Sequence, residues 1–214
     1  MVQSLNFSSL ASIGKIVRSP SLLIPHLSVP DIRYINFKAL QAAGIRAVVF
    51  DKDNTITAPY VEQVHPAFDK SWKSCKDTFG QDRVLIVSNS AGTPDDVGHK
   101  KAATVEAALG VPVLRHTLKK PAGGDILSSY FGCPSHCIAV VGDRAFTDIV
   151  YGNLNGMLTV HVTKIVTEEG DNKIAALIRK LEYPLVNWLR QRGLSPPHHS
   201  AFEKHNPQDF VRES

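Results

Sequence analysis

Five short runs of mostly consecutive apolar residues recur along this 214-residue chain, and they constrain its fold more than any other feature. Apolar residues that do not alternate with polar ones are typical of strands buried on both faces of a parallel sheet. Val, Ile and Leu dominate the runs, as expected of strands. We therefore expect strands over residues 47–50, 84–87, 111–114, 138–141 and 158–162.

Helical patterns fill the segments between these runs. Strands that alternate with helices predict an α/β domain with a doubly wound parallel sheet. Residues 171–190 predict one or two closing helices, broken or kinked at Pro184, in which Trp188 packs against the domain. Apolar spacing and capping residues predict earlier helices over 32–42, 68–79, 97–109 and 126–130.

The composition excludes several classes of protein. A hydrophobic content of 43% and a net charge of +4 exclude a disordered chain. Three cysteines are too few for a disulfide-stapled secreted module, and the sequence has no apolar run of 18 residues that would predict a transmembrane helix. The mild basic excess suggests an acidic partner, and no nucleic-acid-binding motif accompanies it.

The two ends of the chain differ in composition from the middle. Residues 1–30 lack Asp and Glu, are rich in Ser and place apolar residues on one helical face, which predicts an amphipathic extension. It is either a mitochondrial targeting and membrane-associating segment or a helix that packs on the domain. Residues 31–193 then form the folded domain, and the Pro- and His-rich residues 194–214 form a flexible tail with a solvated His199.

Polar residues follow four of the five apolar runs. Ligands of an open parallel sheet bind at the carboxyl ends of its strands, so these residues are candidates for one site. Each group alone has a simpler explanation as a turn or a solvated charge, but turns do not account for all four in this order. In chain order the groups are Asp51, Asp53, Asn54 and Thr55; Ser88 and Asn89; Lys119 and Lys120; and Gly142, Asp143 and Asp148.

The sequence resembles the haloacid dehalogenase superfamily of phosphatases over residues 45–162. The segments that carry the resemblance are D-K-D-N-T from Asp51, V-S-N-S ending at Ser90, K-K-P ending at Pro121, and G-D-R-A-F-T-D from Gly142. More narrowly, they are similar to the mitochondrial phosphatidylglycerophosphate phosphatases of fungi and plants and their small bacterial relatives. That family implies removal of the terminal phosphate of phosphatidylglycerophosphate, a step toward cardiolipin.

The resemblance implies roles that agree with what phosphomonoester cleavage needs. Asp51 is the expected nucleophile, which forms an aspartyl-phosphate, and Asp53 the expected general acid and base. Mg²⁺ is expected on Asp51, the backbone carbonyl of Asp53 and Asp143, with Asp148 in support.

Phosphate binding is expected from the remaining residues. Ser88, Asn89 and Lys120 would hold the phosphoryl group, with Lys119 the rival of Lys120. Asn54 and Thr55 would shape the loop around Asp51.

The segments between these groups leave no room for a cap domain. An uncapped site suits a substrate too large to enclose, such as a lipid headgroup at an anionic membrane surface. With the resemblance, this predicts a peripheral enzyme on the matrix side of the inner mitochondrial membrane. The alternatives are a capless phosphatase for a soluble or protein phosphoester, and a receiver domain, whose acceptor Asp would follow a later strand than Asp51 does.

Overall fold

The structure is a computed structural model that describes the chain apart from residues 1–13, 168, 170, 172, 213 and 214. Residues 1–13 of the predicted amphipathic extension therefore lie outside the described residues, whereas residues 14–18 are helical. No helix among the described residues has both the length and the apolar character needed to cross a bilayer.

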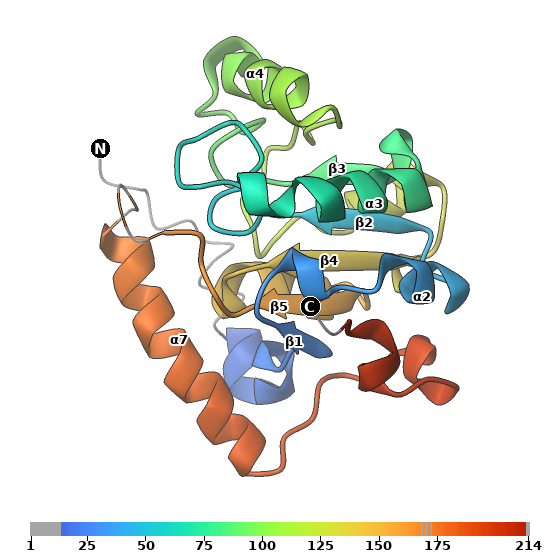
Figure 1. The fold of residues 1–214 in the computed structure, drawn as a ribbon. Coiled ribbons are helices and arrows are strands. Elements are labelled where there is room, and N and C mark those ends of the chain that lie inside the picture. Colours follow the sequence, from blue (N-terminus) through green and yellow to red (C-terminus); the bar gives the residue numbers. More distant parts are fainter. Residues whose placement is uncertain (1–13, 168, 170, 172, 213–214) are drawn as a thin grey trace.

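A parallel sheet of five strands forms the centre of the fold (Figure 1). The strands lie in the order β1-β5-β4-β2-β3, and all neighbours run parallel. The predicted parallel α/β class is thus confirmed. The strands are β1 (Leu27–Val29), β2 (Ala47–Phe50), β3 (Val84–Ile86), β4 (Ile138–Gly142) and β5 (Leu158–Val162).

Helices cover both faces of this sheet. Side chains of α2, α3 and α4 pack on one face, and those of α5 and α6 on the other. Alternate residues of β2 enter the two clusters, which is why that strand is apolar throughout. The α-helices are α2 (Phe37–Ala42), α3 (Asp69–Phe79), α4 (Lys100–Leu109), α5 (Ile126–Phe131), α6 (Val150–Leu154) and α7 (Lys173–Gln191).

Short helical turns join these elements. One of them, η7 (Ala145–Ile149), is π-helical and follows β4 directly, a position that matters for the site below. The 3₁₀ turns are η1 (Pro20–Leu23), η2 (Ile32–Tyr34), η3 (Pro66–Phe68), η4 (Gln81–Arg83), η5 (Val97–His99), η6 (Ser135–Cys137), η8 (Ser200–Glu203) and η9 (Pro207–Phe210).

The prediction of a strand over residues 111–114 is wrong. These residues lie beside the edge strand β3, but they share only an isolated bridge with it, between Ile86 and Val113. Pro112 lacks the N–H that a longer ladder would need. The fifth strand is instead β1, which pairs with β5 at the other edge of the sheet.

The domain extends beyond both boundaries that the sequence suggested. Residues 20–30 supply β1 and the buried Leu23 and Ile24, so they are part of the core. The expected flexible tail is packed as well: Phe210 of η9 is fully buried, and His199, which was expected to be solvated, is also buried. The tail returns to the domain through backbone bonds to Tyr34 and Asn36, a long-range contact without a periodic sequence signal.

Two helix predictions also change in detail. The expected helix over 32–42 is divided into η2 and α2, because Asn36 interrupts it and caps α2 through a bond from the Ala39 N–H. The closing helix α7 is continuous, with Pro184 inside it.

Candidate active site

Two central strands bring the first carboxylates together. β2 and β4 are neighbours, paired Phe50 with Val141, so the residues that follow them emerge at one edge. The chain leaves β2 toward β3 on one side and returns to β4 on the other, which makes this edge a topological switch point, where ligands bind in such sheets.

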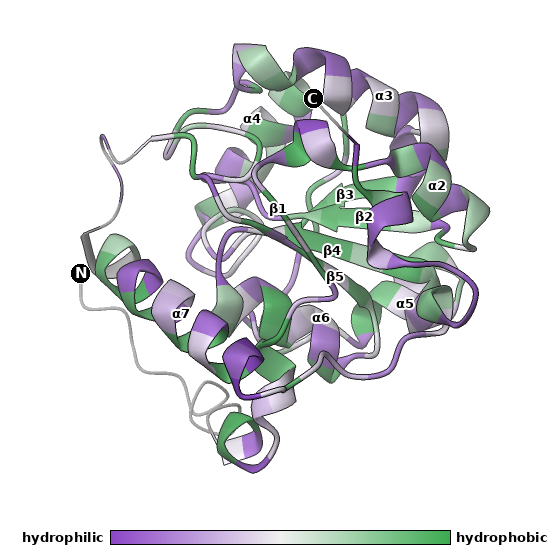
Figure 2. Cartoon of the chain, turned by 60° about the horizontal axis from the view of Figure 1, so that its bottom comes forward, coloured by the Kyte–Doolittle hydropathy of each residue, from purple (hydrophilic) through white to green (hydrophobic). Residues whose placement is uncertain are grey.

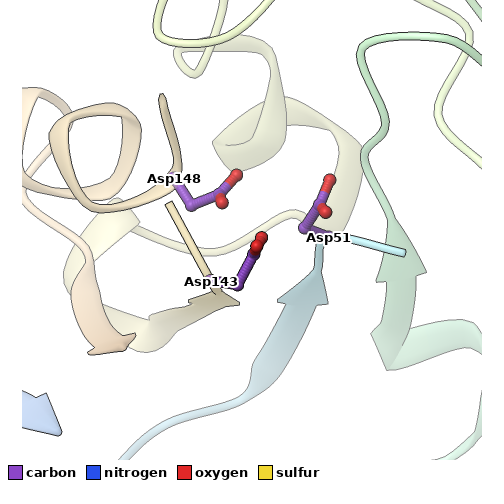
Figure 3. A group of neighbouring side chains, drawn as sticks. All are labelled: Asp51, Asp143 and Asp148. Carbon is purple, nitrogen blue, oxygen red and sulfur yellow. The ribbon is translucent and has the colours of Figure 1, made fainter. Parts of the chain in front are cut away.

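Three aspartates converge at that point (Figure 3). Asp51 follows β2, Asp143 follows β4, and the π-helical η7 turns Asp148 back toward them. One oxygen from each lies within 4.8 Å of the others. The predicted metal-binding carboxylates are thus neighbours, and Asp53 contributes no carboxylate to this group among the described residues.

Gly142 allows this close arrangement. A Cβ atom at that position would lie 2.3 Å from Cγ of Asp148, far inside van der Waals contact. The absence of a side chain on Gly142 therefore lets Asp148 lie directly against the end of β4.

Lys120 links two of the aspartates. Its Nζ donates to Asp51 at 2.7 Å and to Asp148 at 2.6 Å, from a nearly fully buried side chain. Asn89 fixes the Lys120 backbone, because its Oδ1 accepts from the Lys120 N–H at 2.7 Å. Lys119 points elsewhere, to the exposed Asp95.

Burial and like charges shape the electrostatics. Burial, together with the neighbouring carboxylates of Asp51 and Asp148, raises the pKa of Asp143 well above its ordinary value. Burial also raises the pKa of Asp51, which Lys120 opposes. Burial by itself would lower the pKa of Lys120, but Asp148 and Asp51 raise it, so the ammonium stays charged. The cluster therefore favours additional positive charge.

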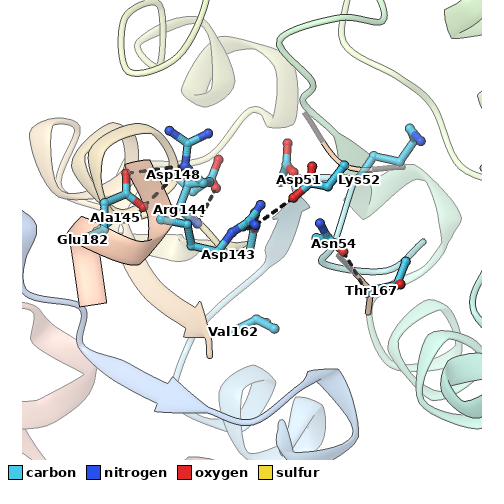
Figure 4. A network of polar contacts seen from close by, with 12 residues as sticks. Asp51, Lys52, Asn54, Asp143, Arg144, Ala145, Asp148, Val162, Thr167 and Glu182 are labelled. Carbon is cyan, nitrogen blue, oxygen red and sulfur yellow. Dashed lines mark hydrogen bonds and ion pairs between the residues drawn. The ribbon is translucent and has the colours of Figure 1, made fainter. Parts of the chain in front are cut away.

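Arg179 adds a cation that sequence reasoning missed. It reaches into the site from α7 and donates from Nε to Asp143 at 2.8 Å and from Nη1 to Asp171 at 2.8 Å. Glu182, one turn further along the same helix, accepts bonds from the backbone N–H groups of Ala145 and Phe146 (Figure 4). Neither residue lies in a motif; the only signal in the sequence is their shared helix face.

Asp53 stands at the cavity wall, slightly apart from the three aspartates. Its Oδ1 accepts from Nζ of Lys52 at 2.5 Å and from the Tyr60 N–H at 2.9 Å. Lys52 is buried beneath the loop, where it also donates to the Val61 carbonyl, so its role is to hold the loop. These contacts within the loop thus hold the Asp53 carboxylate at the wall of the cavity that Asp51 also lines.

The predicted phosphate-binding residues divide into two groups. Ser88 and Asn89 line the cavity, and Ser88 Oγ accepts from the Ser90 N–H at 3.1 Å. Asn54 and Thr55 do not reach it: both are buried below the loop, and Asn54 Oδ1 accepts from the Thr167 N–H (Figure 4). The expectation that their side chains bind phosphate is corrected, because the left-handed backbone of Asn54 turns the chain away there.

The cavity enclosed by these residues measures about 160 Å³. Pockets for drug-sized ligands are larger, roughly 300–1,000 Å³, so this one fits a phosphoryl-sized group and leaves the rest of a large ligand outside. Its walls combine carboxylates, cations and hydroxyls. They are Asp51, Asp53, Pro59, Tyr60, Ser88, Asn89, Ser90, Lys120, Asp143, Arg144, Thr147, Asp148, Asp171 and Arg179.

Comparison with known proteins agrees with this arrangement. Residues 7–167 match the sequence model of a family described as mitochondrial PGP phosphatase. A chloroplastic phosphatidylglycerophosphate phosphatase of Chlamydomonas reinhardtii is 45% identical over 84% of this chain and 67% of its own length. A chloroplastic/mitochondrial one of Arabidopsis thaliana is 45% identical over 89% of this chain, which spans only 55% of that protein.

The alignment with a third relative spans almost the whole length of that protein. A mitochondrial phosphatidylglycerophosphatase of Saccharomyces cerevisiae is 34% identical over 86% of this chain and 99% of its own length. The family resemblance read from the four motifs is therefore confirmed. With its match across most of the domain and the converging site, this chain belongs to the mitochondrial PGP phosphatase family and is a phosphatase.

Proposed function

We propose that this phosphatase removes the terminal phosphate of phosphatidylglycerophosphate to yield phosphatidylglycerol, a cardiolipin precursor. The observation that carries the chemistry is the Asp51 carboxylate, which lies at the cavity wall, paired with Lys120 and close to the carboxylates of Asp143 and Asp148. The relatives named for this substrate support the choice of phosphoester.

Asp51 is the proposed nucleophile. Its Oδ forms a bond to phosphorus while the bond from phosphorus to the glycerol oxygen breaks, and Asp53 gives the departing oxygen a proton. Asp53 then takes a proton from water as the water oxygen attacks phosphorus, which releases phosphate and restores Asp51. The bonds from Lys52 and Tyr60 to Asp53 support this role, because they hold its carboxylate at the cavity wall.

The phosphoryl oxygens meet fixed donors in this proposal. Lys120 neutralises charge on Asp51 and on the phosphoryl group. Ser88 and Asn89, both at the cavity wall, supply hydrogen bonds to the phosphoryl oxygens. Asn89 serves twice, because its side chain also holds the Lys120 backbone.

The residues present fit a magnesium ion. Carboxylate oxygens are the ligands that Mg²⁺ prefers, and three of them lie close together here. We assign the ion to Asp51, Asp143 and the backbone carbonyl of Asp53, with Asp148 in support. When bound, Mg²⁺ supplies positive charge that offsets repulsion between these carboxylates and an incoming phosphate.

We expect Mg²⁺ to be required for turnover and to stabilise the fold. At a hundredfold excess over its dissociation constant, a ligand stabilises the native state by about 2.7 kcal/mol, which raises Tm by about 5 °C or more for this size. Phosphate release stops in EDTA and resumes with excess Mg²⁺. The Asp143→Asn variant loses the thermal shift, whereas Asp95→Asn, at an exposed position, keeps it. Full turnover in EDTA contradicts the metal assignment.

The open site supports a lipid substrate and a membrane surface as partner. Residues 51–83, all described, form a loop and α3, which packs on the sheet. A small cavity that no separate domain covers, within the described part of the chain, would leave the acyl chains of a lipid outside. The mitochondrial names of two relatives support a mitochondrial location, and we assign the enzyme to the matrix side of the inner membrane.

A comparison of substrates tests the lipid assignment. We expect kcat/KM for phosphatidylglycerophosphate in mixed micelles to exceed that for glycerol 3-phosphate and for a phosphopeptide by at least about tenfold, because only the lipid retains contacts beyond the phosphoryl group. Phosphate release is measured at matched phosphoester concentrations. Equal values across the three substrates would indicate the alternative, a capless phosphatase of broad specificity.

A further inference from the structure

One face of α7 exposes an apolar stripe. Leu177, Leu181, Pro184 and Trp188 follow one another at spacings of four, three and four residues, so they lie in a line along the helix. Leu177 is 61% exposed, Leu181 63% and Trp188 48%. Trp188 was expected to pack in the domain, but its ring lies under the Arg192 guanidinium, 4.4 Å from the ring centroid. Figure 2 shows this helix at the margin of the molecule.

The opposite face of α7 belongs to the active site. Arg179 and Glu182 point inward, to Asp143 and to the turn after β4, and Val186 is buried below them. Figure 1 shows the helix at the side of the sheet from which the loops after β2 and β4 emerge. A surface that engages the stripe therefore lies near the mouth of the catalytic cavity.

The charge around the stripe is positive. Lys180 and Arg192 are exposed on and just after α7, whereas Glu182, the one acidic residue in the sequence of residues 173–192, has a fully buried side chain. Arg192 lies at the end of the stripe, and exposed Lys15 and Arg18 belong to the helical residues 14–18. Ile16 of that segment packs on the same apolar cluster as Leu185 of α7, so these cations lie beside the helix.

We propose that the apolar stripe of α7 docks the enzyme on an anionic lipid surface. Amphipathic helices with apolar residues on one side and basic residues at the flanks lie in the plane of the lipid headgroups, where Trp side chains are favoured. The basic flanks, toward the C-terminal end of α7, face the anionic headgroups. The stripe is distinct from the N-terminal extension, which the sequence suggested for this role.

Charge argues against a second copy of the chain as the occupant. Two copies of α7 that met along the stripe would place basic residues on both sides of the contact without an exposed acidic residue of α7 to pair with them, which disfavours that pairing. An anionic surface instead complements the same flanks. The inference deepens the proposed function and rests on it only for turnover, because lipid binding is measured without substrate.

Vesicle binding by the full-length chain tests the docking surface. The variant L181E/W188E places two carboxylates on the stripe. The matched control is I126E/Y130E, which changes one aliphatic and one aromatic residue at exposed positions (43% and 46%) of α5. Figure 2 places α5 away from α7. Sedimentation with vesicles of phosphatidylcholine, with and without about 30 mol% phosphatidylglycerol, gives the partition coefficient. Size-exclusion chromatography gives the oligomeric state.

We expect the wild type and I126E/Y130E to bind anionic vesicles equally and L181E/W188E to bind at least about tenfold more weakly, with all three proteins equally active on a soluble phosphoester. Equal binding of both variants overturns the proposal, as does equal binding to neutral and anionic vesicles. A change in oligomeric state without a change in vesicle binding assigns the stripe to self-association instead. If the wild type binds anionic vesicles but does not hydrolyse phosphatidylglycerophosphate, the proposed substrate is contradicted and the docking surface is not.

Discussion

We expect phosphate release to fall by at least about a thousandfold in the Asp51→Asn variant, on the scale of losses seen when a catalytic nucleophile is removed. An amide oxygen carries no negative charge and does not form the acyl-phosphate bond, so the first step is lost. The change is nearly isosteric, and the amide oxygen still accepts a bond from Lys120, which donates to Asp51 at 2.7 Å in the wild type. Steady-state phosphate release measures the effect.

The fold provides the control for this variant. Burial raises the pKa of Asp51, and the neighbouring carboxylates repel its charge, so removing that charge should not lower Tm. Asp95→Asn, which changes an exposed carboxylate, should retain wild-type activity. More than about a tenth of wild-type turnover in Asp51→Asn, with unchanged Tm, would exclude Asp51 as the nucleophile.

The neighbouring lysines should differ sharply on replacement. Lys120→Ala leaves Asp51 and Asp148 close together without their shared cation, and breaking a buried ion pair costs about 3–5 kcal/mol. The same change removes positive charge from the phosphoryl site, for which we expect at least about a hundredfold loss of kcat. Lys119→Ala removes only an exposed pair with Asp95, worth about 0–1 kcal/mol.

Urea unfolding measures the loss of stability in Lys120→Ala, and phosphate release measures its loss of activity. Lys120→Met restores the apolar length of the side chain without its charge, so it should regain packing but not activity. Mg²⁺ should recover part of the lost stability, because it supplies positive charge to the same carboxylates. If Lys119→Ala lost as much activity as Lys120→Ala, the assignment of the catalytic lysine would be wrong.

The central strands were predictable because each run carries its own evidence. Residues 47–50, 138–141 and 158–162 are buried on both faces in the structure, as their apolar composition requires. At the edges of the sheet that evidence fails. Residues 111–114 are buried beside β3 without forming a ladder, whereas Leu27–Val29 forms a strand after a segment that looked like a leader. The composition of a segment predicts that it is buried, but whether it pairs as a strand depends on which backbone lies beside it in the fold.

The site divides in the same way. Asp51 and Asp143 each directly follow a strand, and parallel strands bring their carboxyl ends to one edge of the sheet, so the proximity of the two carboxylates could be inferred. The inward direction of Arg179 could not be inferred, because Arg179 lies 36 residues beyond Asp143 and its direction depends on how α7 packs across that edge. Asn54 shows the converse: it lies in a motif, yet its loop turns it beneath the cavity.

Taken alone, the apolar runs predict a parallel sheet, and the motifs that follow them, through their resemblance to known phosphatases, predict the family and a site of carboxylates and a lysine. They do not establish which face each helix turns toward that site. Only the tertiary structure decides that Arg179 enters the site while Leu181 and Trp188, on the same helix, remain exposed. The physical reason is that a helix's orientation follows from the sum of its packing contacts with distant parts of the chain, whereas strand ends are local to the sequence.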